Sequence, residues 1–146
     1  MFQKILLATD GSESSEHAMQ LALELGAVHH AKVMALYVND PYPYIGVGSV
    51  NPVGYLAYMD TVKKYASEIH QKFIEMAQKL APTVAVECLL LEDTVASVGI
   101  LQTSKEQCCD LIVMGSHGRS GLGRLILGSV ASKVVNTSPI PVLITR

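Results

Sequence analysis

The chain has 146 residues and a formal net charge of −2, a length sufficient for one domain with a sizeable core. Hydrophobic residues make up 49% and charged residues 16%, a composition that excludes a disordered chain. With no lysine-rich block, no tryptophan and only 5% aromatic residues, the sequence lacks the charge and the stacking platforms of nucleic-acid-binding proteins. We therefore expect a single domain over residues 1–146 that binds no nucleic acid.

The N-terminal segment and the cysteines favour a cytoplasmic protein. Residues 1–8 are too short for a secretory signal and Asp10 follows them, while no apolar run approaches the roughly 20 residues of a membrane span. Cys88, Cys108 and Cys109 include no CxxC pair, so a zinc site is not expected. We expect buried or half-buried thiols in a reducing compartment. A redox switch formed by the adjacent pair is the alternative, and it needs unusual geometry.

Strand and helix signals alternate through the first third of the chain. Residues 5–8 are continuously apolar, as in a strand that is buried on both faces. Ser12 is a plausible N-cap for a helix, and residues 32–38 predict a second strand. The apolar stripe expected for that helix is Ala18, Leu21, Ala22 and Leu25. Residues 40–55, rich in Pro, Gly and Tyr, form either a lid or binding element or a surface excursion.

The same alternation continues to the end of the chain. A long amphipathic helix carries Val62, Tyr65, Ile69, Phe73, Met76 and Leu80 at helical spacing, and Pro82 ends it. Further strands are expected over 84–91, 111–115 and 142–145, with helices over about 94–107 and from about 128. Gly99 weakens the helix prediction over 94–107.

Five strands alternating with four helices predict an α/β fold, an open, doubly wound parallel sheet with helices on both faces. We assume the strand order 3-2-1-4-5, which makes strands 1 and 4 flank the point where ligands bind such sheets. Asp10 follows the first strand and the segment 115–119 follows the fourth, so both are expected at one crevice.

The second of these segments has the chemistry of a phosphate cradle. Gly115 and Gly118 allow close backbone approach, and Gly128 opens the last helix. Ser129 would donate to a phosphate at the helix N-terminus, and Arg119 would neutralise phosphate charge. The alternatives are that the glycines serve only turns, that Ser129 is only an N-cap and that Arg119 is a solvated loop charge.

Two further residues would complete a nucleotide site. Asp10 would accept a ribose hydroxyl or hold Mg²⁺ through water, unless it only caps the first helix. The backbone of Val38, beyond the second strand, would read the Watson–Crick edge of an adenine. No GxxxxGK[ST] motif occurs, so this is not a P-loop enzyme, and the lone acid after strand 1 argues against a phospho-receiver domain. His117 pairs with no evident nucleophile.

As a whole, the sequence closely resembles the universal stress protein family. The resemblance runs over Ile5–Ser12, Leu36–Asp40, Asp110–Arg119 and from Gly128 to Ile144. The family's nucleotide-binding signature, G-x2-G-x9-G-[ST], falls on Gly115, Gly118, Gly128 and Ser129.

The resemblance implies an adenine nucleotide alpha-hydrolase-like fold and a site for ATP, with Mg²⁺. The residues it implies for nucleotide binding are Ala8, Thr9, Asp10, Val38, Met114, Gly115, Gly118, Arg119, Gly128, Ser129 and Val130. Ala8 departs from the proline common at this position. The resemblance also implies a homodimer that pairs the strand Val142–Thr145 of two protomers.

These features favour a nucleotide-sensing regulatory protein of the stress response, which acts on an unknown protein partner. A weak ATPase or nucleotide-transferring enzyme is one alternative, although neither Asp10 nor His117 has an evident orienting partner as a general base. A stress-related protein that binds another ligand, such as AMP or cyclic AMP, is the other.

Overall fold

Five parallel strands form one sheet in the order β3-β2-β1-β4-β5, which confirms the expected fold class and strand order. The structure is a computed structural model that describes residues 1–42, 52–118 and 127–146. The strands are β1 (Lys4–Ala8), β2 (Lys32–Val38), β3 (Val86–Leu91), β4 (Leu111–Gly115) and β5 (Val142–Thr145). The helices are α1 (Glu13–His29), α2 (Pro52–Leu80), α3 (Ala96–Glu106) and α4 (Ser129–Thr137).

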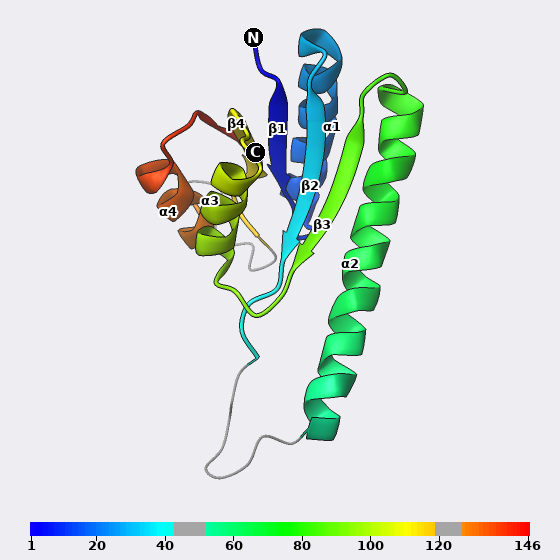
Figure 1. The fold of residues 1–146 in the computed structure, drawn as a ribbon, viewed down its shortest axis with the longest axis vertical. Coiled ribbons are helices and arrows are strands. Elements are labelled where there is room, and N and C mark those ends of the chain that lie inside the picture. Colours follow the sequence, from blue (N-terminus) through cyan, green and yellow to red (C-terminus); the bar gives the residue numbers. More distant parts are fainter. Residues whose placement is uncertain (43–51, 119–126) are drawn as a thin grey trace.

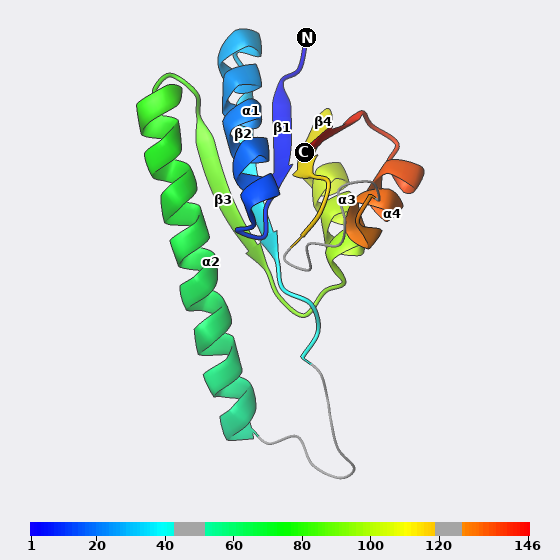
Figure 2. The same ribbon diagram turned by 180° about the vertical axis from the view of Figure 1, so that it is seen from behind.

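The helices cover both faces of the sheet. Figures 1 and 2 show α1 and α2 on one side and α3 and α4 on the other. Alternate residues of β1 serve the two faces, as strand geometry requires: Ile5 and Leu7 pack in the core under α1 and α2, and Leu6 and Ala8 in the core under α3 and α4. A strand buried on both faces is apolar at successive positions, the pattern that identified β1 in the sequence.

The first helix begins as predicted, and its buried stripe differs from the predicted one at one position. Ser12 is its N-cap, and its side chain accepts from the N–H of Ser15. Met19 and Leu23 are fully buried, whereas Leu21 and Leu25 are only partly buried. The predicted stripe is confirmed at Ala18 and Ala22, which are buried, and at Leu25, which packs against the core. It was wrong at Leu21, because α1 turns the side with Met19 and Leu23 toward the sheet.

Three predicted elements have shifted boundaries. Helix α2 begins at Pro52, inside the segment expected to be a loop, and proline is favoured at the first position of a helix. Strand β3 begins at Val86 and not at residue 84, because the N–H of Val84 closes a turn on the carbonyl of Ala81 at 3.0 Å. Helix α3 is shorter than predicted at both ends. Residues 43–51 lie outside the described part of the chain.

Gly99 has a packing reason that the sequence does not reveal. A Cβ at this position would lie 2.8 Å from Cδ2 of Leu91 and 3.1 Å from Cγ1 of Val38. The glycine lets α3 approach the ends of β2 and β3 closely. In residues 1–42, 52–118 and 127–146, no helix has both the length and the apolar character needed to cross a membrane.

Candidate functional site

A cavity of about 810 Å³ opens at the carboxyl ends of the strands. Its walls come from the segments after β1, β2 and β4 and from α2, α3 and α4. Ten of the predicted nucleotide-binding residues line it: Ala8, Thr9, Asp10, Val38, Met114, Gly115, Gly118, Gly128, Ser129 and Val130. The eleventh, Arg119, lies outside the described residues. The sheet thus brings together residues from opposite ends of the chain at the expected switch point.

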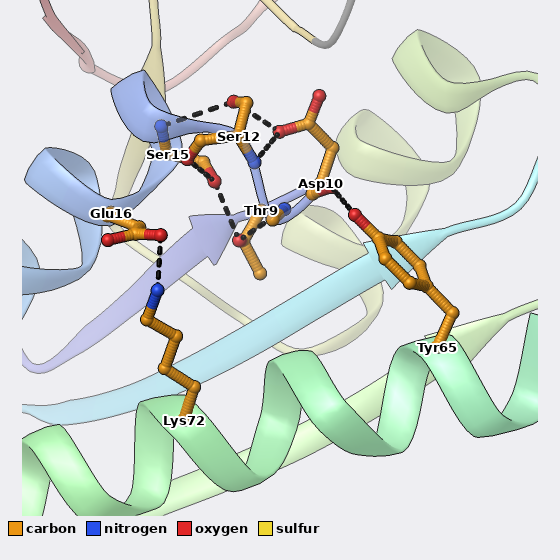
Figure 3. A network of polar contacts seen from close by, with 8 residues as sticks. Thr9, Asp10, Ser12, Ser15, Glu16, Tyr65 and Lys72 are labelled. Carbon is orange, nitrogen blue, oxygen red and sulfur yellow. Dashed lines mark hydrogen bonds and ion pairs between the residues drawn. The ribbon is translucent and has the colours of Figure 1, made fainter.

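The turn after β1 is held by its own polar side chains (Figure 3). Oδ1 of Asp10 accepts from the N–H of Ser12 at 3.0 Å and from its hydroxyl at 2.6 Å. The hydroxyl of Thr9, buried under the turn, donates to Ser15 Oγ at 3.1 Å. Asp10 therefore orients the turn while Ser12 caps α1, and the alternative that Asp10 itself is the cap is wrong.

Helix α2 holds the same turn from outside. The hydroxyl of Tyr65 donates to the backbone carbonyl of Asp10 at 3.0 Å, and Lys72 pairs with Glu16 of α1 (Figure 3). Gly11 has φ +77°, and a Cβ there would lie 2.7 Å from the Tyr65 hydroxyl. Both constraints require glycine at position 11.

The end of β4 is packed tightly against the start of α1. A Cβ at Gly115 would lie 2.5 Å from Ser14 Oγ and 2.9 Å from the Ser14 backbone carbon. Ser14 donates to the carbonyl of His117, and Thr145 Oγ1 donates to the carbonyl of Ser14 at 3.0 Å. Gly115, which lines the cavity, thus lies at a fixed junction of β4, β5 and α1.

Helix α4 presents its N-terminus to the cavity. Gly128 is the N-cap, no side chain caps it, and the first turn holds no acidic residue. Ser129 is therefore the first helical residue, and the alternative that it is the N-cap is wrong. A Cβ at Gly128 would lie 3.0 Å from the carbonyl oxygen of Ser116, and one at Gly118 would lie 2.8 Å from Asp10 Oδ2. Bare glycines keep this end open, and the helix dipole makes it favourable for anions.

The opposite end of the cavity lies at the tip of β2. The β1–β2 ladder ends where Thr9 N–H donates to the carbonyl of Leu36 at 3.0 Å, while Asn39 N–H donates to Leu91 of β3 at 2.8 Å. Alternate residues of a parallel strand bond to opposite neighbours, so Val38 directs its N–H and carbonyl to the β1 side, beyond the end of β1. This places a donor and an acceptor beside the cavity that Val38 lines.

Several lining residues were missed in the sequence. Tyr58 of α2, Asn39, Ser15, Ala96 and Ile100 also face the cavity. Tyr58 continues the helical spacing of Val62 and Tyr65 toward the N-terminus, so extending that stripe by one turn would have found it. The others carry no local signal, because only the packing of α1, α3 and the strand ends brings them to the site.

The sequence indicated no nucleophile beside His117, and the structure corrects this, because one serine hydroxyl contacts its ring. Its Nδ1 lies 3.0 Å from the hydroxyl of the adjacent Ser116, which is buried. Its Nε2 is buried without a hydrogen-bond partner among the described residues. No carboxylate of the described residues orients the ring, so the pair lacks the third member of a nucleophile–base–orienter arrangement.

Known proteins provide an independent comparison. Residues 1–146 match the sequence profile of the universal stress protein family. The universal stress protein MJ0531 of Methanocaldococcus jannaschii is 31% identical over 146 residues, covering 100% of this chain and 83% of that protein. The universal stress protein YxiE of Bacillus subtilis is 33% identical over 153 residues, covering both chains completely.

Solved structures agree in fold. The universal stress protein UspA from Lactobacillus plantarum has a TM-score of 0.80 at 23% identity, covering 99% of this chain and 97% of that one. A universal stress protein in complex with cAMP has a TM-score of 0.75 at 22% identity, covering 99% and 97%. The universal stress protein from Archaeoglobus fulgidus in complex with dAMP has a TM-score of 0.70 at 18% identity, covering 99% of this chain and 98% of that one. A universal stress protein family protein from Arabidopsis thaliana with AMP bound has a TM-score of 0.69 at 18% identity, covering 98% and 90%.

Proposed function

The chain belongs to the universal stress protein family, and on that premise we propose that it is an ATP-binding regulatory protein of the stress response. The observation that carries the proposal is the convergence of ten predicted nucleotide-binding residues on one cavity at the switch point of the sheet. Related structures hold cAMP, dAMP or AMP, which supports an adenine nucleotide as the ligand class.

The two ends of the cavity fit the two ends of such a ligand. The N-terminus of α4 and the bare Gly118 and Gly128 suit phosphates. At the other end, the N–H and carbonyl of Val38 match N1, an acceptor, and the N6 amino group, a donor, of adenine. Guanine presents the reverse pattern on the same edge, so the proposal includes selectivity for adenine.

Mg²⁺ fits this site as a companion of the phosphates. Among the described residues no cluster of three His, Cys, Asp or Glu side chains could hold a metal ion. Oδ1 of Asp10 already accepts two hydrogen bonds from Ser12. Phosphate oxygens and waters would therefore supply most ligands, with Asp10 acting through a water. The described residues that line the cavity include no Lys or Arg. The ion would therefore supply positive charge that neutralises the phosphates.

Nucleotide binding would act through a surface of the protein that a partner recognises. Nucleotide occupancy would change the surface around α4 and be read by a protein partner, with the protein in the cytoplasm and paired through Val142–Thr145. The site would hydrolyse ATP slowly at most, because His117 has no orienting carboxylate among the described residues. Turnover above the roughly 1 s⁻¹ low end of typical enzyme rates would contradict this part of the proposal.

Isothermal titration of the purified protein with ATP, AMP and cyclic AMP, each with and without Mg²⁺, tests the ligand. We expect ATP to have the lowest Kd of the three ligands, and Mg²⁺ to lower the Kd for ATP further. Equal or tighter binding of AMP or cyclic AMP would favour the family's other adenine ligands over ATP. Binding of none of the three would contradict the proposed function, and the mass of a small molecule that co-purifies would identify the ligand directly.

A further inference from the structure

A polar pair formed by Asn39 and Tyr58 lies at the end of the cavity near Val38, where the adenine is proposed to bind. Both residues line the cavity, Asn39 directly after β2 and Tyr58 from α2. The Tyr58 hydroxyl lies 3.3 Å from both Oδ1 and Nδ2 of Asn39. Each contact is longer than its usual range, which is roughly 2.7–3.2 Å for an N–H···O bond and roughly 2.5–3.0 Å for an O–H···O bond. The pair therefore retains hydrogen-bonding capacity beside the cavity.

Both residues are held in place by contacts that do not use this capacity. Asn39 is 8% exposed, and its backbone is fixed by bonds to Leu91 and Thr94 at 2.8 and 3.2 Å. Its Nδ2 also donates to the carbonyl of Asp40 at 3.1 Å. The ring of Tyr58 packs edge-on against Tyr42, with centroids 4.9 Å apart. The pair is thus pre-positioned before any ligand arrives.

The chemistry of the pair matches one edge of adenine. An asparagine amide and the N6/N7 edge of adenine are complementary, because N6 is a donor and N7 an acceptor. Along β2, the N–H of Val38, its carbonyl and then Asn39 follow one another. Around the purine, N1, N6 and N7 follow one another in the same sense. If Val38 meets N1 and N6, N7 is directed toward the side of Asn39 and Tyr58.

We propose that Asn39 and Tyr58 read the N6/N7 edge of the bound adenine. This inference rests on the proposed function. Oδ1 of Asn39 accepts the second N6 proton. The Tyr58 hydroxyl accepts from Nδ2 of Asn39 and donates its own proton to N7. Tyr58 is then a specificity-determining residue for the purine ring, and Asn39 both contacts the base and orients the hydroxyl.

The test compares the Kd for ATP with that for 7-deaza-ATP, in which N7 is replaced by C–H. The wild-type protein is expected to bind 7-deaza-ATP about tenfold more weakly, the effect of about one hydrogen bond. In Tyr58→Phe, which keeps the ring against Tyr42, this ratio is expected to fall to near one. Tyr55→Phe is the matched control, since Tyr55 also packs on Tyr42 but does not line the cavity, and it should keep the wild-type ratio.

A second variant tests whether the Tyr58 hydroxyl donates to N7. Asn39→Asp leaves only acceptor oxygens, so the hydroxyl of Tyr58 turns its proton to the carboxylate and is lost to N7. The ratio should again fall to near one. Equal Kd values for both ligands in the wild type, or a ratio that both variants leave unchanged, would overturn the inference while ATP binding itself upholds the proposed function. Absence of binding by either ligand would overturn both.

Discussion

Gly118 lies directly against the carboxylate of Asp10: a Cβ at position 118 would come within 2.8 Å of Oδ2. The two residues follow β4 and β1, which are neighbours in the sheet. The atom that would be displaced is the end of a side chain and not backbone, so the site would change while the fold persists.

We therefore expect Gly118→Val to fold but to bind ATP at least about tenfold more weakly, since its side chain would occupy the phosphate approach and displace Asp10. Isothermal titration measures the affinity, and circular dichroism checks the fold. Thr137→Val, at an exposed position of α4 that does not line the cavity, is the control and should bind ATP normally. An unchanged Kd for Gly118→Val would show that phosphates do not lie here.

Gly115 belongs to the same motif but should respond differently. A Cβ at this position would lie 2.9 Å from the backbone carbon of Ser14, which cannot move without shifting the start of α1. Gly115→Ala is expected to lower the free energy of unfolding by about 1–3 kcal/mol, the usual effect of overpacking a fixed site. Denaturant unfolding of Gly115→Ala and Gly118→Ala side by side would test this. Equal destabilisation by the two would contradict the distinction.

The glycine motif also shows where prediction from sequence ends. Its spacing identified the residues at the tip of β4 and at the start of α4, because continuous apolar runs and helix signals place those elements. Gly115 and Gly118 have different roles because Gly115 contacts Ser14 and Gly118 contacts Asp10. These contacts form only in the folded chain. The same holds for Tyr58 and Asn39, whose contact joins α2 to β2. The misassignment of Leu21 in α1 has a related cause, since Leu21 and Met19 are both apolar and only packing selects between them.

His70 makes stability depend on pH. Burial between α2 and β3 lowers the pKa of His70 below its ordinary value of 6.5, partly opposed by a hydrogen bond with the backbone of Leu89. Between the lowered pKa and 6.5 the unfolded chain binds more protons than the folded one, so stability falls as pH decreases through this window. We expect the urea midpoint to fall between pH 7 and pH 5, and less so in His70→Gln, which does not titrate. If the urea midpoint falls equally in the wild type and in His70→Gln, titratable groups other than His70 cause the pH dependence.

The cysteines should differ in reactivity. Burial raises the pKa of Cys109 to about 11, and Cys109 is almost fully buried, while the adjacent Cys108 is exposed. Because the thiolate is the reactive form, iodoacetamide at pH 8 should alkylate Cys108 well before Cys109. Peptide mass spectrometry at timed intervals measures the two rates. In denaturant both residues should react at similar rates, and equal rates in the folded protein would contradict the burial of Cys109.

The outer edge of β5 allows a direct test of the proposed homodimer. The carbonyls of Pro141 and Thr145 accept from the N–H groups of Ile112 and Ser116, so both residues face β4. Because alternate residues of a strand face opposite neighbours, Val142 directs its N–H away from β4. Val142→Pro removes that outward donor at the first residue of the strand, where proline is tolerated. Sedimentation velocity should show a dimer for the wild type and a folded monomer for this variant. Leu143→Pro, which removes a donor facing β4, should instead lower the free energy of unfolding. A wild-type monomer at micromolar concentration, or a dimer that survives Val142→Pro, would contradict pairing through β5.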